Sequence, residues 1–88
     1  MTDRLVIALA QLNPTVGAVT SNLAKARQAY GQAKAAGADL VLYSELYIAG
    51  YPPEDLVLRP TFVAACRAAI EDLAKDTAHG PAILIGLP

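Results

Sequence analysis

The sequence predicts an α/β fold in which three short parallel strands alternate with two amphipathic helices. Two kinds of segment support this prediction: short apolar runs that lack polar alternation, and longer stretches in which apolar residues recur every three or four positions. Glycine and proline clusters separate these segments. The resulting order is strand, helix, strand, loop, helix, strand, which implies parallel pairing through right-handed crossovers.

Three apolar runs are predicted to be strands, at residues 5–10, 39–43 and 82–86. Because polar residues do not alternate with the apolar ones, the pattern is typical of strands that are covered on both faces. The third strand would present a bare apolar edge if nothing lay beside it. We therefore expect these residues to be the N-terminal part of a larger domain.

Two amphipathic helices are predicted over about residues 20–36 and 61–77. Their apolar stripes are expected at Leu23, Ala26, Tyr30 and Ala33, and at Phe62, Cys66, Ala69 and Leu73. Thr20 or Ser21 is available as the first N-cap, and Gly37 ends that helix. Gly31 costs about 1 kcal/mol relative to alanine in a helix, so we expect a close packing partner there.

The composition indicates a thin hydrophobic core. Of 88 residues, 55% are apolar, but 18 of them are alanine, only one is phenylalanine and none is tryptophan. Small side chains bury little area each. A chain of this length buries only roughly 60 to 65% of its unfolded surface, which supports the expectation that it belongs to something larger.

Charge and cysteine content exclude several classes of function. The net charge is −1 and no run of like charge occurs, so we expect neither a nucleic-acid partner nor a membrane partner. Cys66 is the only cysteine and His79 the only histidine, which excludes an internal disulfide and a zinc site of these residues. The apolar runs are far shorter than the roughly 18 residues of a membrane span. These features predict a cytoplasmic protein without a metal in this segment.

Glu45 is the strongest candidate for chemistry because it follows directly on a buried strand. A carboxylate held there beside a low-dielectric wall suits a general base, although from position alone a merely solvated glutamate at a strand-to-loop junction is the more common case. Cys66 lies in the middle of an apolar stripe and is expected to be a structural thiol. His79, Glu71, Asp72 and Asp76 are expected to be solvated, and Glu54 with Asp55 to cap a short helical turn that leads to Leu58. The glycines form no phosphate-binding fingerprint.

Several runs of residues resemble one known family. They are Ala10 to Gly17, Asn22, Gly37 to Val41, Ser44 to Leu46, and above all Gly50 to Pro60 with its Tyr-Pro-Pro-Glu-Asp-Leu core. Together they resemble the glutaminase part of glutamine-dependent NAD⁺ synthetases, which belongs to the nitrilase (carbon-nitrogen hydrolase) superfamily. The resemblance covers essentially the whole chain, which would be the N-terminal β-α-β-α-β part of a nitrilase-type α-β-β-α sandwich.

The resemblance implies a mechanism with three catalytic residues. A cysteine thiolate attacks the side-chain amide of glutamine, a glutamate acts as general base and then acid, and a lysine stabilises the oxyanion. Of these, only the glutamate matches a position here, Glu45, although Ser44 stands where a proline is more common. Cys66 does not match the nucleophile, and Lys25, Lys34 and Lys75 fall on predicted helices, so the isolated chain is expected to be inactive. Tyr51 matches a tyrosine beside the glutamine pocket, with a packing role almost equally expected.

The resemblance also implies cofactors and partners for a longer protein. Glutamine supplies ammonia, and a separate synthetase domain uses ATP and Mg²⁺ to amidate nicotinic acid adenine dinucleotide, whereas no cofactor is expected in this segment. Members of the superfamily commonly associate, so a homo-oligomer is expected at full length. Two alternatives remain: part of another nitrilase-type amidase, or a small non-enzymatic α/β binding module.

Overall fold

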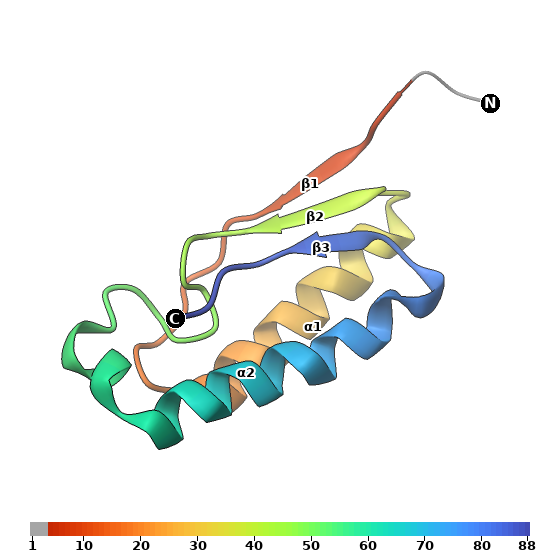
Figure 1. The fold of residues 1–88 in the computed structure, drawn as a ribbon. Helices are drawn as coiled ribbons and strands as arrows, with labels where there is room; N and C mark the ends of the chain where they lie inside the picture. The colour runs from red at the N-terminus through yellow and green to blue at the C-terminus, as the bar shows by residue number, and fades with distance from the viewer. Residues whose placement is uncertain (1–3) are drawn as a thin grey trace.

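A computed structural model describes residues 4–88, and its elements follow the predicted order (Figure 1). The strands are β1 (Ile7–Ala10), β2 (Leu40–Tyr43) and β3 (Ala82–Leu84); the α-helices are α1 (Val19–Ala35) and α2 (Pro60–Ala74); and two 3₁₀ helices are η1 (Glu54–Leu58) and η2 (Lys75–His79). Each predicted strand and helix is therefore confirmed, with strands shorter than the apolar runs. The second predicted helix is α-helical as far as Ala74 and continues as the 3₁₀ helix η2.

The sheet is parallel throughout, in the order β1-β2-β3. Ala8, Val41 and Ile83 are paired in register and point to the same face. Both long helices lie against that face, as Figure 1 shows. There Tyr30 of α1 and Leu73 of α2 belong to apolar clusters that include residues of the strands. The core therefore lies between one face of the sheet and the helix pair.

The other face of the sheet is uncovered within residues 4–88. Leu9 and Leu84 expose 65% and 64% of their surface, and Ile7 is exposed beside them. Within residues 4–88 the strands are thus covered on one face only, and covering of both faces stays a prediction for the larger domain. The physical reason is that both helices pack on the same side, while alternate strand residues point to opposite sides.

The helix ends agree only partly with the sequence. Gly37, with a φ of +85°, follows the C-terminus of α1 as predicted, and Pro60 occupies the first turn of α2. Neither Thr20 nor Ser21 caps α1, which begins after Ala18 without a side-chain cap. The predicted packing partner of Gly31 is not found among residues 4–88, where a Cβ at this exposed position would have no atom within 4 Å.

An ion-pair cluster joins the two helices at their exposed edge. The Arg27 Nε donates to Asp76 Oδ2 at 2.7 Å, and Arg27 Nη2 donates to the Asp72 carbonyl oxygen at 3.1 Å. The prediction that Asp72 and Asp76 are merely solvated is therefore wrong. Local sequence patterns do not reveal this ion pair, because the arginine lies 45 or more positions away in sequence. His79 and Glu71 are exposed, as predicted. Within residues 4–88, neither helix is long and apolar enough to cross a membrane.

Candidate active site

Glu45 lies in a tight turn just beyond the carboxyl end of β2. The backbone N–H of Tyr47 donates to the Ser44 carbonyl at 3.2 Å and closes the turn around Glu45 and Leu46. Leu46 has a φ of +50°, a left-handed conformation that is uncommon for a residue with a branched side chain. Glu45 is exposed, so the low-dielectric wall expected around it is not supplied by residues 4–88. The turn fixes the backbone of Glu45, from which the carboxylate extends, at a strand end where α/β folds place ligands.

The buried Asn22 of α1 is hydrogen-bonded to this loop. Its Nδ2 donates to the Ile48 carbonyl at 3.0 Å and to the Thr15 carbonyl at 2.9 Å, and its Oδ1 accepts from the Thr15 N–H at 2.9 Å. Asn22 is fully buried. One amide therefore joins the loop after β1 to the loop after β2, where Glu45 lies.

The two loops also touch directly through glycine. The Gly17 N–H donates to the Ala49 carbonyl at 2.9 Å. Gly50 has a φ of +82°, and a Cβ at this position would lie 2.5 Å from the Val16 Cα. Only glycine satisfies both the backbone conformation and the close approach.

Two tyrosines, one at the end of β2 and one in the loop after it, donate hydrogen bonds to α1. The hydroxyl of Tyr43 donates to the Ala26 carbonyl at 2.7 Å, and that of Tyr47 donates to the Asn22 carbonyl at 2.9 Å. Their ring centroids are 5.5 Å apart. Burial, with a smaller contribution from the neighbouring Tyr47, raises the pKa of Tyr43 to about 12, so its hydroxyl remains a neutral donor.

The extension of β3 reaches the Glu45 turn as well. A Cβ at Gly86 would lie 3.1 Å from the Leu46 backbone nitrogen, so the segment after β3 passes close to the turn. The segments that follow all three strands therefore converge around residues 44–50, as expected for the carboxyl edge of a parallel sheet.

Tyr51, the predicted substrate-binding residue, follows this loop and exposes 61% of its surface. It lies just before Pro53 and η1, where Glu54 and Asp55 form the first turn without a side-chain cap. The short turn leading to Leu58 is thus confirmed, whereas capping by these acidic side chains is wrong. The exposed ring of Tyr51 is accessible to a ligand or to another surface.

The other candidate groups do not assemble with Glu45. Cys66 is fully buried in α2, within an apolar cluster that includes Ile48 and Ala69. Burial raises the pKa of its thiol, so at neutral pH it is protonated, which confirms the structural interpretation. Lys25 and Lys34 lie on α1 and Lys75 on η2, all exposed. No group of three acidic, histidine or cysteine side chains that could hold a metal occurs in the part of the chain that the structure describes.

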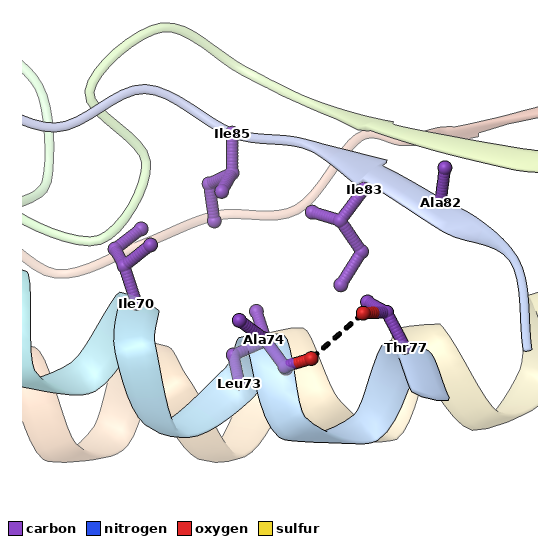
Figure 2. Close-up of a pocket in the computed structure, with 7 residues that line it drawn as sticks. All are labelled: Ile70, Leu73, Ala74, Thr77, Ala82, Ile83 and Ile85. Atoms are coloured by element: carbon purple, nitrogen blue, oxygen red, sulfur yellow. Dashed lines mark hydrogen bonds between the residues drawn. The ribbon is translucent and has the colours of Figure 1, made fainter. Parts of the chain in front are cut away.

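An apolar cavity of about 300 Å³ lies between α2 and β3 (Figure 2). Its lining residues are Ile70, Leu73, Ala74, Thr77, Ala82, Ile83 and Ile85. The Thr77 hydroxyl is already used, since it donates to the Ala74 carbonyl at 2.7 Å. This cavity offers no titratable group, so the Glu45 turn is the better candidate for chemistry.

Asn22 is the functional candidate that sequence reasoning missed, although it lies in a run that carries the family resemblance. The available signal was its spacing, because Asn22 precedes Ala26 by four positions and so falls on the buried stripe of α1. A polar residue on such a stripe requires hydrogen-bond partners in the folded protein.

Comparison with known proteins places these observations in a family. The family described as Carbon-nitrogen hydrolase matches residues 6–88. The chain is 51% identical over 88 residues to a glutamine-dependent NAD(+) synthetase of Rhodobacter capsulatus, covering all of this chain and 16% of that protein. It is 44% identical over 84 residues to the Thermotoga maritima protein of the same name, covering 94% of this chain and 15% of that protein.

Solved structures show the same relationship. The glutamine-dependent NAD+ synthetase of Acinetobacter baumannii, determined with ADP, superimposes with a TM-score of 0.83 and 36% identity over 92% of this chain and 15% of that one. An amidase from Nesterenkonia sp. superimposes with a TM-score of 0.80 and 30% identity over 96% of this chain and 32% of that one. The chain thus spans about one sixth of the length of the curated relatives it matches. It belongs to the carbon-nitrogen hydrolase family, and its strands and helices form part of a nitrilase-type α/β fold.

Proposed function

We propose that this chain supplies the general base, Glu45, to the glutaminase site of a glutamine-dependent NAD⁺ synthetase. The observation that carries the proposal is the place of Glu45, at the carboxyl edge of the sheet in a turn fixed by buried hydrogen bonds. The similarity of almost the whole chain to synthetases supports the choice of glutamine as substrate.

In the proposed reaction, Glu45 transfers a proton from nucleophile to leaving group. The carboxylate accepts the proton of a cysteine thiol, and the resulting thiolate forms a bond to the side-chain amide carbon of glutamine. Protonated Glu45 then returns the proton to the departing nitrogen, so ammonia leaves as the carbon-nitrogen bond breaks. Glu45 then takes a proton from water, which attacks the thioester carbon; the carbon–sulfur bond breaks, glutamate is released, and Glu45 returns the proton to the cysteine sulfur. Cys66 is buried in an apolar cluster of α2 and does not fit this role, so the proposed nucleophile comes from outside these residues, and the oxyanion-binding lysine is proposed to do so as well.

The ammonia would be consumed in an ATP- and Mg²⁺-dependent amidation of nicotinic acid adenine dinucleotide. Within residues 4–88 no glycine-rich phosphate loop and no cluster of acidic side chains fits ATP or Mg²⁺. No step of that amidation is therefore assigned to this chain. Tyr51, exposed beside the Glu45 loop, is proposed to contact glutamine. A cytoplasmic homo-oligomer is the proposed setting of the whole enzyme.

The test uses a chimeric synthetase, in which this chain replaces the segment that it matches in the Rhodobacter capsulatus protein. Free ammonia in place of glutamine bypasses the glutaminase site and so reports whether the rest of the enzyme is intact. We expect Glu45→Gln to lower glutamine-dependent NAD⁺ formation at least about a hundredfold, while ammonia-dependent formation is unchanged. Cys66→Ala is the matched control and should retain both activities. Full glutamine-dependent activity in Glu45→Gln would contradict the role of this carboxylate.

A second candidate function is hydrolysis of a different amide. The structural similarity to the Nesterenkonia amidase supports it, because the described residues match that enzyme nearly as well as the synthetase. The gene product that contains this chain distinguishes the two functions: release of ammonia from glutamine favours the synthetase, and release only from other amides favours the amidase.

A further inference from the structure

We propose that Asn22 is a positioning residue, whose side-chain amide holds the Glu45 loop in the conformation from which the carboxylate acts. This inference rests on the proposed glutaminase function. It concerns a fully buried group, 23 positions before Glu45 in sequence, that would act through the loop and not on the substrate.

The amide of Asn22 is almost completely used. Both Nδ2 protons are donated, one to each loop, and Oδ1 accepts the Thr15 N–H, all at 2.9 to 3.0 Å. The side chain is fully buried, so water cannot replace any of these bonds without a change of structure. Because Asn22 is part of α1, it ties two irregular loops to a rigid element, as precise sites require.

The bond to Ile48 acts on the turn that carries Glu45. Ile48 is three residues beyond Glu45, and between them Leu46 adopts its left-handed conformation. Such a conformation persists only where the surrounding contacts impose it. The bonds of the Asn22 amide to Ile48 and of the Asn22 carbonyl to Tyr47 hold the turn, and the backbone at Gly86 passes close to Leu46 as well.

Replacement of Asn22 by aspartate would test this role with almost no change of shape. Aspartate keeps the acceptor for the Thr15 N–H but, when ionised, loses both donors and faces the carbonyl oxygens of Thr15 and Ile48. The loop would then leave its native position and move Glu45 relative to the nucleophile. A misplacement of about 1 Å can lower a rate about a hundredfold.

The experiment measures steady-state kinetics of glutamine hydrolysis in the chimeric synthetase and its Asn22→Asp and Asn22→Ala variants. We expect kcat to fall about 10- to 100-fold and KM for glutamine to change by a smaller factor, because Glu45 lies within the loop that Asn22 binds, whereas Tyr51 follows that loop. Ammonia-dependent NAD⁺ formation should stay at the wild-type rate. Unchanged kcat for glutamine in both variants would overturn the inference.

A purely structural role is separated by a matched control on the same helix. Tyr30→Phe also removes hydrogen bonds of a buried α1 side chain, those to the Pro81 and Asp76 carbonyls, at the end of the helix far from Glu45. We expect it to retain glutamine kcat. If Tyr30→Phe lowers glutamine kcat as much as Asn22→Asp, or if ammonia-dependent activity falls together with glutamine hydrolysis in the Asn22 variants, the positioning role is wrong. A fully active Glu45→Gln enzyme would instead contradict the proposed function itself.

Discussion

The Tyr47 hydroxyl donates a 2.9 Å hydrogen bond to the Asn22 carbonyl, joining the Glu45 loop to a helix 25 positions earlier. Both residues are fully buried, so the bond lies away from water. It leaves the side-chain amide of Asn22 free for Thr15 and Ile48. Backbone and side chain of one residue thus bind two adjacent residues of the loop, which restrains its rotation as well as its position.

Removal of this hydroxyl should have a measurable but limited effect. Tyr47→Phe keeps the ring packing and removes one buried hydrogen bond, while the Asn22 carbonyl still accepts the N–H four residues later in α1, so we expect the free energy of unfolding to fall by about 0.5 to 1.5 kcal/mol. Glutamine kcat of the chimeric synthetase should fall less than in Asn22→Asp, since the amide bonds remain. Urea unfolding and glutamine kinetics measure the two effects. A larger kinetic loss than that of Asn22→Asp would show that the hydroxyl, and not the amide, controls the loop.

Two glycine-to-alanine substitutions should have opposite effects on stability. Gly50→Ala introduces a Cβ 2.5 Å from the Val16 Cα at a φ of +82°, and we expect a loss of roughly 2 to 4 kcal/mol together with reduced glutamine hydrolysis. Gly31→Ala meets open space on the exposed side of α1, and we expect a gain of about 0.5 to 1 kcal/mol. Thermal unfolding of both variants tests the pair. A stabilised Gly50→Ala protein would mean that the two loops do not touch in solution.

Cys66 should react slowly with thiol reagents. Its full burial blocks access and raises the pKa of the thiol, so little thiolate exists at pH 8. We expect modification of Cys66 by a disulfide reagent to be at least about a hundredfold slower in the folded protein than in urea, as mass spectrometry of the Cys66 peptide would measure. Equal rates in both states would indicate that α2 is detached from the loops.

Stability should decrease in strong alkali in a way that depends on Tyr43. The folded protein raises the pKa of this hydroxyl from 10 to about 12, so the unfolded chain loses the proton first. The contribution of Tyr43 is fully present below pH 10 and is lost as the pH rises from 10 to about 12. Tyr43→Phe should show a shallower fall of the unfolding midpoint over this interval. An identical fall in both proteins would contradict the raised pKa.

The order of elements was predictable because it depends on local patterns. The apolar run at residues 5–10 and the spacing of Ala26, Tyr30 and Ala33 predict β1 and α1, and Gly37 marks the helix end. The start of α1 was not predictable, because suitable capping residues such as Ser21 occur near it but do not cap the helix. A propensity shows what a residue can do, and the surrounding chain decides whether it does so.

The candidate site was only half predictable. Glu45 could be identified from its place after an apolar run, but its supports could not, since Asn22 and Ile48 are 26 positions apart and their contact depends on how helix and loops meet. The same holds for the bond of Arg27 to Asp76, which spans 49 positions. Side chains that look solvated along one helix become partners once a second helix lies beside it.

The row of Ile7, Leu9 and Leu84 on the uncovered face of the sheet sets up a kinetic competition during synthesis. Exposed apolar strands attract whichever apolar surface arrives first, either a later segment of the same chain or another nascent chain. The first encounter does not depend on protein concentration, whereas the second grows with it. Slow expression at low temperature should therefore increase the soluble yield of any longer chain that carries these residues, and substitution of Leu9 by a charged residue would weaken both encounters, because both use that exposed side chain.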